Sequence, residues 1–174
     1  MGLRPAKTCR TLTKVAWARF SKKKPRKSFV KALPHNALNI FEMGVRKDEY
    51  ELEVELVSDG EIQVRDNALE SARQAVNKYF EKLLPGNYHF AVLVFPHNVI
   101  RENKMILGAG ADRLQKGMRH AFGRPMDRAA RIYPNQVVYR LHVMARNLDA
   151  AREAYRRAKA KLPGSYSVRV RKLN

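Results

Sequence analysis

Apolar and acidic side chains alternate strictly between residues 50 and 57. The apolar positions are Tyr50, Leu52, Val54 and Leu56, and the acidic positions between them are Glu51, Glu53 and Glu55. A period of two places successive side chains on opposite faces of a strand. The pattern therefore predicts a half-buried strand with a solvated acidic outer face.

Neighbouring carboxylates on that face are about 7 Å apart, too far to share a metal ion without other ligands. After turn residues at 58–61, Ile62 and Val64 predict a short return strand.

Two segments have apolar residues at helical spacing. The first begins at Asn67, where Glu70 three residues later matches a capping box with Asn as the cap, and it ends at Pro85-Gly86. Its apolar positions are Leu69, Ala72, Val76, Tyr79, Phe80 and Leu83. The second spans 148–162 and ends at Pro163-Gly164, with apolar residues Leu148, Ala151, Tyr155, Ala158 and Leu162. Its outer side is basic and carries Arg152, Arg156, Arg157 and Lys159.

Further alternation predicts strands at 88–95, 137–143 and 168–171. The run at 70–75 resembles the run at 149–154, and each is followed by a Pro-Gly break and a strand. Either the chain contains two related helix–strand units, or two unrelated helices end with the same Pro-Gly signal. We predict one α+β domain with a mixed sheet and two main helices.

The charged residues are sorted along the chain, whose net charge is +19. Residues 1–41 have no acidic side chain, whereas residues 42–81 hold 11 of the 16 carboxylates and only 5 of the 35 Lys and Arg residues. Self-repulsion on this scale is best compensated by a large polyanion, so nucleic acid is the expected partner. On the second predicted helix, the residues expected to bind RNA are Arg152, Arg156 and Lys159. A membrane partner is disfavoured, because the sequence has neither an apolar run of about 20 residues nor a wide apolar face.

No enzymatic or metal chemistry is indicated by the polar residues. The five histidines are scattered without a metal-ligand spacing, and Cys9 is alone. We therefore predict no catalytic residues, no metal and no cofactor. The lone cysteine is typical of a reducing, cytoplasmic compartment.

The N-terminal segment, residues 1–31, is basic, with few apolar residues. We interpret it as an arm that becomes ordered on RNA, with Trp17, Phe20 and Phe29 available to stack on bases. A disordered tail, a nuclear localisation signal at 22–27 and a transit peptide are the alternatives. The cations expected to bind RNA in this arm are Arg4, Lys7, Arg10, Lys22, Lys23, Lys24, Arg26 and Lys27.

The segment 96–133 predicts a flexible, cationic protrusion. Gly108 and Gly110 allow its backbone to approach a partner closely, but Arg113 occupies the place of the third glycine of a dinucleotide-binding fingerprint. An ordinary mobile surface loop is the alternative. Its basic residues are Arg101, Lys104, Arg113, Lys116, Arg119, Arg124, Arg128 and Arg131. The first six of these are predicted to bind RNA.

This segment carries a recognisable signature. Val-Ile-Arg-Glu-Asn-Lys-Met at 99–105, Gly-Ala-Asp-Arg-Leu at 110–114, Gly-Met-Arg at 117–119 and Ala-Phe-Gly at 121–123 resemble the central signature of one ribosomal protein family. It is the archaeal and eukaryotic large-subunit family called L-ten-e, the counterpart of bacterial L-sixteen. Similar landmarks occur at 4–7, 40–44, 67–70 and 156–164. The chain lacks a long extension after its last predicted strand, which favours an archaeal member.

The resemblance implies an α/β-hammerhead domain, here 32–174, that binds large-subunit ribosomal RNA beside neighbouring ribosomal proteins. It also implies a position near the A site and the peptidyl-transferase region, with a flexible loop at about 102–114 directed toward tRNA. The loop residues implied to lie near tRNA are Glu102, Asn103, Lys104, Met105, Gly108, Gly110 and Asp112. Two departures from the family pattern, at Glu42 and at 126–128, place RNA contacts at 126–128 in question. A stand-alone RNA-binding or RNA-processing protein and a nonspecific nucleic-acid chaperone are the other hypotheses.

Overall fold

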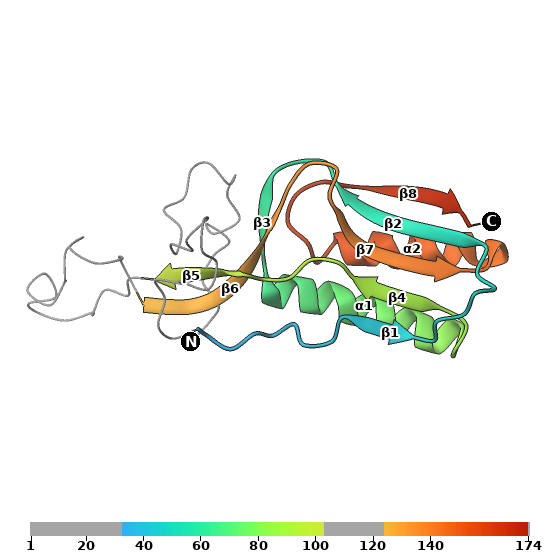
Figure 1. Ribbon diagram of the computed structural model, residues 1–174, viewed down its shortest axis with the longest axis horizontal. Helices are drawn as coiled ribbons and strands as arrows, with labels where there is room; N and C mark the ends of the chain where they lie inside the picture. Colours follow the sequence, from blue (N-terminus) through green and yellow to red (C-terminus); the bar gives the residue numbers. More distant parts are fainter. Residues whose placement is uncertain (1–32, 103–123, 174) are drawn as a thin grey trace, which may run out of the picture.

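The structure is a computed structural model that describes residues 33–102 and 124–173 (Figure 1). The elements in chain order are β1 (Glu42–Gly44), β2 (Leu52–Ser58), β3 (Ile62–Arg65), α1 (Asp66–Leu83), β4 (His89–Val92), β5 (Asn98–Glu102), β6 (Arg124–Ile132), β7 (Val137–Val143), the 3-10 turn η2 (Ala145–Asn147), α2 (Leu148–Lys159) and β8 (Tyr166–Lys172). The predicted α+β class with two main helices is confirmed. The predicted arm at 1–31 and most of the predicted loop at 102–114 lie outside the described residues.

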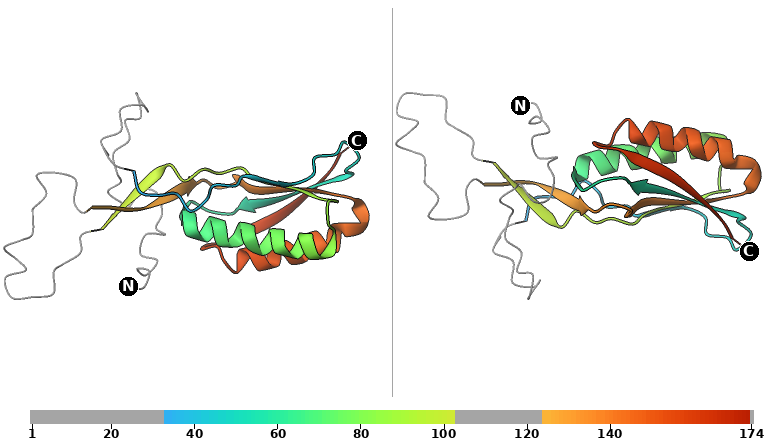
Figure 2. Two further views of the ribbon diagram at one scale, coloured as in Figure 1. Left: turned by 90° about the horizontal axis from the view of Figure 1, so that it is seen from below. Right: turned by 90° about the horizontal axis from the view of Figure 1, so that it is seen from above.

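The strands form two sheets, where we expected one mixed sheet. A five-stranded sheet has the order β1-β4-β7-β2-β8, and a three-stranded sheet has the order β3-β6-β5. Both helices lie on the same side of the five-stranded sheet (Figure 2). Every strand pairing in the described part of the chain is antiparallel. At the centre of the larger sheet, β4 and β2 run in the same direction, but β7 lies between them and runs in the opposite one.

The repeat seen in the sequence corresponds to a repeat in the fold. The first unit is β2–α1–β4 and the second is β7–α2–β8, and β2 pairs with β7 at the centre of the sheet. The strand after each helix then pairs with the central strand of the other unit, since β4 lies beside β7 and β8 beside β2. This is an interlocked pair of split βαβ units. A Pro-Gly pair follows each helix, with Gly86 at φ 72° and Gly164 at φ 89°. The helix α1 ends two residues before Pro85, whereas α2 ends at Lys159, four residues before Pro163 and earlier than the predicted end at 162.

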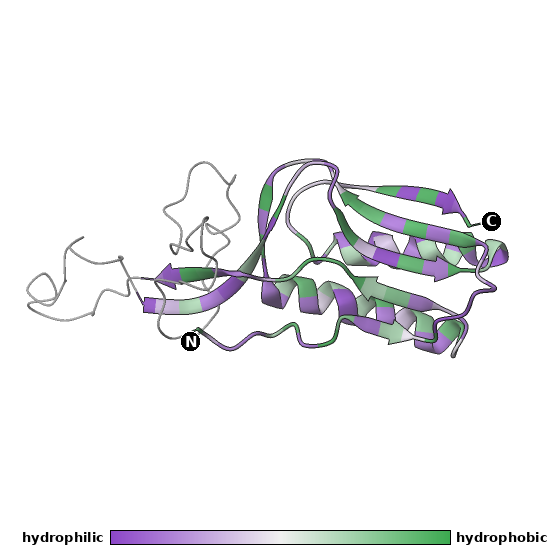
Figure 3. Ribbon diagram, in the orientation of Figure 1, coloured by the Kyte–Doolittle hydropathy of each residue, from purple (hydrophilic) through white to green (hydrophobic). Residues whose placement is uncertain are grey.

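The core lies between the helices and the five-stranded sheet. Figure 3 shows hydrophobic and hydrophilic residues alternating along β2 and β8, as expected for strands with one apolar face toward the helices. Two fully buried tyrosines connect the layers. Tyr139 of β7 donates to the Leu69 carbonyl of α1 at 2.9 Å, and Tyr155 of α2 donates to the Val54 carbonyl of β2 at 2.8 Å. Burial raises the pKa of both hydroxyl groups well above the ordinary value, so both remain donors.

The start of α1 differs from the expected capping box. The helix begins at Asp66, and Asn67 makes no side-chain cap. The Asp66 carboxylate instead accepts from the backbone N–H groups of Asn67 and Ala37, each at 2.8 Å. This negative group at the helix N-terminus is favourable to the helix dipole, and it fixes the segment that leads into β1.

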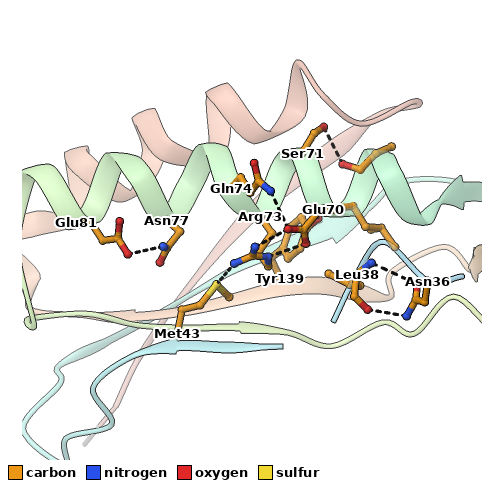
Figure 4. A network of polar contacts seen from close by, with 12 residues as sticks. Asn36, Leu38, Met43, Glu70, Ser71, Arg73, Gln74, Asn77, Glu81 and Tyr139 are labelled. Carbon is orange, nitrogen blue, oxygen red and sulfur yellow. Dashed lines mark hydrogen bonds and ion pairs between the residues drawn. The ribbon is translucent and has the colours of Figure 1, made fainter. Parts of the chain in front are cut away.

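Glu70, which was predicted to complete the capping box, forms an ion pair with Arg73 instead. It binds the buried guanidinium of Arg73, which also donates to the sulfur of Met43 in β1 at 2.9 Å (Figure 4). The hydrogen bond from Arg73 lowers the pKa of Glu70, so the pair remains ionised. Gln74 adds a hydrogen bond to Glu70 at 2.9 Å. This cluster attaches the edge strand β1 to α1.

The backbone of Gly44, the last residue of β1, lies close to that of Tyr88 at the sheet edge. It has φ 81°, and a Cβ there would collide with the Tyr88 carbonyl oxygen. Gly86 has a similar φ of 72° but open space around it, whereas Gly60 has neither constraint.

We predict that Gly44→Ala lowers the free energy of unfolding much more than Gly86→Ala does. Gly86→Ala should cost about 1–2 kcal/mol, the ordinary penalty for a left-handed non-glycine residue, and Gly60→Ala should be close to neutral. Gly44→Ala adds a collision with main-chain atoms that have little room to move. Urea unfolding of the three variants measures the difference, and equal destabilisation by Gly44→Ala and Gly86→Ala would contradict the close approach.

Candidate nucleic-acid interface

The outer face of α2 is the most exposed group of predicted RNA-binding residues in the described part of the chain. The Arg152 and Arg156 side chains are 61% and 76% exposed, and the third predicted residue, Lys159, is half-buried. The helix carries four cations, the fourth being Arg157, against the two carboxylates of Asp149 and Glu153. This face is therefore cationic and open to solvent.

The carboxylates on α2 hold its arginines in place. Glu153 accepts from Arg156 at 2.7 Å and 2.9 Å and from Arg157 at 2.9 Å. These hydrogen bonds lower the pKa of Glu153 to about 2, so its charge persists at neutral pH. Arg157 also lies over the Tyr79 ring of α1, 4.4 Å from the ring centre. Exposed pairs of this kind are weak and screened by salt, so these guanidinium groups can exchange a carboxylate for a phosphate.

A second group of predicted residues lies at the opposite end of the molecule from α2. β5 and β6 pair and extend away from the five-stranded sheet (Figures 1 and 2). Near their far end, Glu102 lies opposite the exposed Arg124 in the strand register, and Arg101 lies opposite Pro125. Arg101 and Glu102 are half-buried. The structure thus brings Arg101 and Arg124 together but does not bring them to the cations of α2.

The other predicted site residues lie outside the described residues. In the arm they are Arg4, Lys7, Arg10, Lys22, Lys23, Lys24, Arg26 and Lys27. In and after the central loop they are Asn103, Lys104, Met105, Gly108, Gly110, Asp112, Arg113, Lys116 and Arg119.

The paired strands β5 and β6 form what we call the β5–β6 ribbon. Contacts within the protein hold the end of this ribbon that lies nearest the five-stranded sheet. Asp127 forms an ion pair with Arg65 at the end of β3, and Arg128 donates to the Pro34 carbonyl at 2.8 Å. These two residues belong to the stretch where the sequence departs from the family pattern. Both contacts connect this stretch to the rest of the described domain.

The predicted solvated acidic face is wrong for two of its three residues. Glu51 is exposed, but Glu53 is 9% exposed and Glu55 is fully buried. The strand pairing explains the difference: β7 and β8 flank β2 and place Arg140 opposite Glu55 and Arg171 opposite Glu53. Arg140 lies 3.3 Å from Glu53 and 3.2 Å from Glu55, and Arg171 lies 3.9 Å and 3.7 Å from them. The face away from the helices is therefore a layer of alternating charges.

Two histidines extend this layer toward β1. The Nδ1 atoms of His89 and His142 are 3.1 Å apart and their rings are parallel within 7°, so one ring donates to the other. His142 also lies 3.2 Å from Glu53. Burial, and next the neighbouring His142, lower the pKa of His89, so His89 is neutral at neutral pH.

The family model of ribosomal protein L16p/L10e matches residues 18–169. The chain belongs to this family. The large ribosomal subunit protein uL16 of Hyperthermus butylicus is 47% identical over 146 residues, which cover 83% of this chain and 81% of the relative. The uL16 protein of Archaeoglobus fulgidus is 37% identical over 157 residues, 90% of each chain. That of Methanococcus maripaludis is 39% identical over 173 residues, 99% of this chain and 96% of the relative. The resemblance carried by the central signature is confirmed.

Family membership agrees with the chemistry of the described residues, which are suited to binding a polyanion. Among 33–102 and 124–173, no group of three or more His, Cys, Asp and Glu residues could hold a metal ion. Within the same ranges, no helix is long and apolar enough to cross a membrane.

The charged layer on the sheet was missed as a unit in the sequence. A signal for it existed, because Arg140 and His142 alternate along 137–143 and Arg169 and Arg171 along 168–171 with the same period as the glutamates. Opposite charges with equal period on different strands are good candidates for cross-strand pairs.

We predict that Glu55→Gln lowers the free energy of unfolding by about 1–3 kcal/mol, because it removes one of the two buried carboxylates that neutralise Arg140 and Arg171 and leaves only Glu53. The cost stays below that of a fully buried pair because the Arg140 and Arg171 side chains are 35% and 53% exposed. The matched control is Glu61→Gln at an exposed position, which should change stability by less than about 0.5 kcal/mol. Chemical denaturation of both variants tests this, and a neutral Glu55→Gln would show that the layer contributes nothing.

Proposed function

We propose that this protein is a structural constituent of the large ribosomal subunit, in the cytoplasm, where it binds large-subunit ribosomal RNA and contacts neighbouring ribosomal proteins. The observation that carries the proposal is the match of residues 18–169 to the L16p/L10e family. The names of the archaeal relatives, large ribosomal subunit protein uL16, support it. The exposed cations of α2 and the net charge of +19 suit an RNA partner.

The basic segment 1–31 forms, in this proposal, an arm that orders on RNA, and residues 32–174 form the RNA-binding domain. The proposed RNA-binding residues include Arg152, Arg156 and Lys159 of α2 and Arg101 and Arg124 of the ribbon. We assign no catalytic step to the protein. A stand-alone RNA-binding or RNA-processing protein is the alternative, and sedimentation in a sucrose gradient at high salt separates the two. A subunit constituent comigrates with the large subunit, whereas a stand-alone protein remains at the top.

The combined substitution of Arg152, Arg156 and Lys159 by Gln should weaken assembly into large subunits. For each phosphate that is no longer neutralised, the slope of log affinity against log salt should become shallower by about 0.7–0.9. The matched control removes three other cations, Lys47, Lys78 and Lys82, and should change assembly much less. Competition between each variant and the wild type at several salt concentrations is the measurement. A stronger effect of the control set would place the RNA interface elsewhere.

The loop at about 102–114 serves translation more than assembly in this proposal, helping to position tRNA near the A site and the peptidyl-transferase region. Its glycines suit close approach to a moving ligand, and Arg101, Lys104 and Arg113 supply positive charge. They act by electrostatic positioning, with no proton transfer or covalent step.

We expect that Lys104→Ala, or removal of 107–111, leaves the protein bound to subunits and lowers their affinity for tRNA or their rate of peptide transfer. Subunit occupancy and tRNA affinity are measured on the same preparation. A fall in occupancy, with normal tRNA binding by the complete subunits that remain, would make the loop an assembly element instead.

A further inference from the structure

A hollow of about 380 Å³ lies where the two sheets meet. One wall is the connection from β4 to β5, with Leu93 and Phe95, and the other is the turn from β6 to β7, with Tyr133 and Gln136. The volume is within the range of small-ligand pockets, about 300–1,000 Å³. None of the predicted site residues lines it.

The walls of the hollow expose large apolar side chains. Tyr133 is 52% exposed, Leu93 44% and Phe95 40%. The Phe95 ring is held in place, because Phe41 stacks on it with ring centres 5.6 Å apart and the His97 ring centre lies 4.7 Å from it. Apolar rings concentrated around one concavity of a strongly basic protein indicate a ligand with a flat, apolar face.

The turn that carries Tyr133 is held by hydrogen bonds. Asn135 has φ 61° and donates its backbone N–H to the Ser58 carbonyl at 2.8 Å. The Gln136 side-chain oxygen accepts from the Tyr133 backbone N–H at 2.9 Å. Tyr133 is thus presented by a preformed turn, which lowers the entropic cost of binding.

Polar groups lie beside the rings. The amide nitrogen of Gln136 has no partner among the described residues. The nearly buried Asn98 also lines the hollow, and its amide nitrogen donates to the Gln63 side chain at 3.5 Å. Amide groups can read the hydrogen-bonding edge of a base. Arg131 supplies a cationic group at the same hollow, which suits a phosphate.

We propose that this hollow binds one unstacked base of ribosomal RNA, with the base against Tyr133 and Phe95 and its edge toward the amides of Gln136 and Asn98. A nucleotide is the ligand class that combines a flat ring, a hydrogen-bonding edge and an attached anion. The inference rests on the proposed function, since it requires RNA at this surface, and it adds a base-binding site to the described domain, where the residues predicted to bind ribosomal RNA were cations.

The test compares Tyr133→Leu, which removes the ring but keeps an apolar side chain, with Tyr133→Phe, which keeps the ring. Phe95→Leu is the second variant. The control is Leu83→Ala, which changes an exposed apolar residue at the C-terminal end of α1. Each full-length protein is bound to large subunits from which this protein has been removed. Affinity is measured, and contacts are mapped by ultraviolet crosslinking and by chemical probing of base edges.

We expect Tyr133→Leu and Phe95→Leu to bind about 10-fold more weakly, the typical effect of removing one base–aromatic stack, while Tyr133→Phe and Leu83→Ala bind like the wild type. A nucleotide should crosslink to the peptide of Phe95 or Tyr133, and one base edge should become reactive in Tyr133→Leu. Equal binding of Tyr133→Leu and Tyr133→Phe, or a crosslink from the hollow to protein, overturns the base site while RNA binding stands. Failure of the wild type to bind the subunits overturns the proposed function, and the base site with it.

Discussion

The antiparallel pairing of β2 with β7 is the interaction on which the rest of the structure depends. Its register places Val54 opposite Leu141 on the face toward the helices and Glu55 opposite Arg140 on the other face. Because side chains alternate with a period of two, a slip of one residue would turn the charges into the core and the apolar residues out of it. One pairing therefore fixes both the apolar core and the charged layer.

The same pairing joins the two helix–strand units. Tyr139 reaches from the second unit to α1 of the first, and Tyr155 reaches from α2 of the second to β2 of the first. The second unit could not satisfy its two buried hydroxyl groups alone, because the carbonyl groups that accept from them belong to the first unit. The interlocking also explains why α2 has a free outer face: its apolar side is used against β2, β7 and α1, and the basic side remains for solvent or RNA.

The regular elements could be largely predicted from the sequence, because the periods of 2 and 3.6 and the Pro-Gly breaks are local signals. The exposure of Glu53 and Glu55 could not, because alternation shows which side chains share a face of one strand but not which strands lie beside it. The capping prediction failed for a related reason, since Asp66 is held by Ala37 from a distant segment. The hollow was invisible because its walls come from residues 93–98 and 131–136, whose proximity depends on two sheets meeting.

The arginines that form ion pairs are of two kinds, which differ in how deeply the carboxylate partner is buried. Arg140 and Arg171 contact carboxylates with no more than 11% of the side chain exposed. Giving up those contacts would leave a buried charge uncompensated, so these arginines are required by the fold.

The partner of Arg156, Glu153, is 29% exposed, and a pair open to solvent contributes little net stability. A phosphate can take the place of such a partner at small cost and with counterion release. The acidic residues between 42 and 81 are therefore part of the fold. Glu53 and Glu55 neutralise cations that the fold needs, and the cations whose partners are open to solvent remain available to a polyanion.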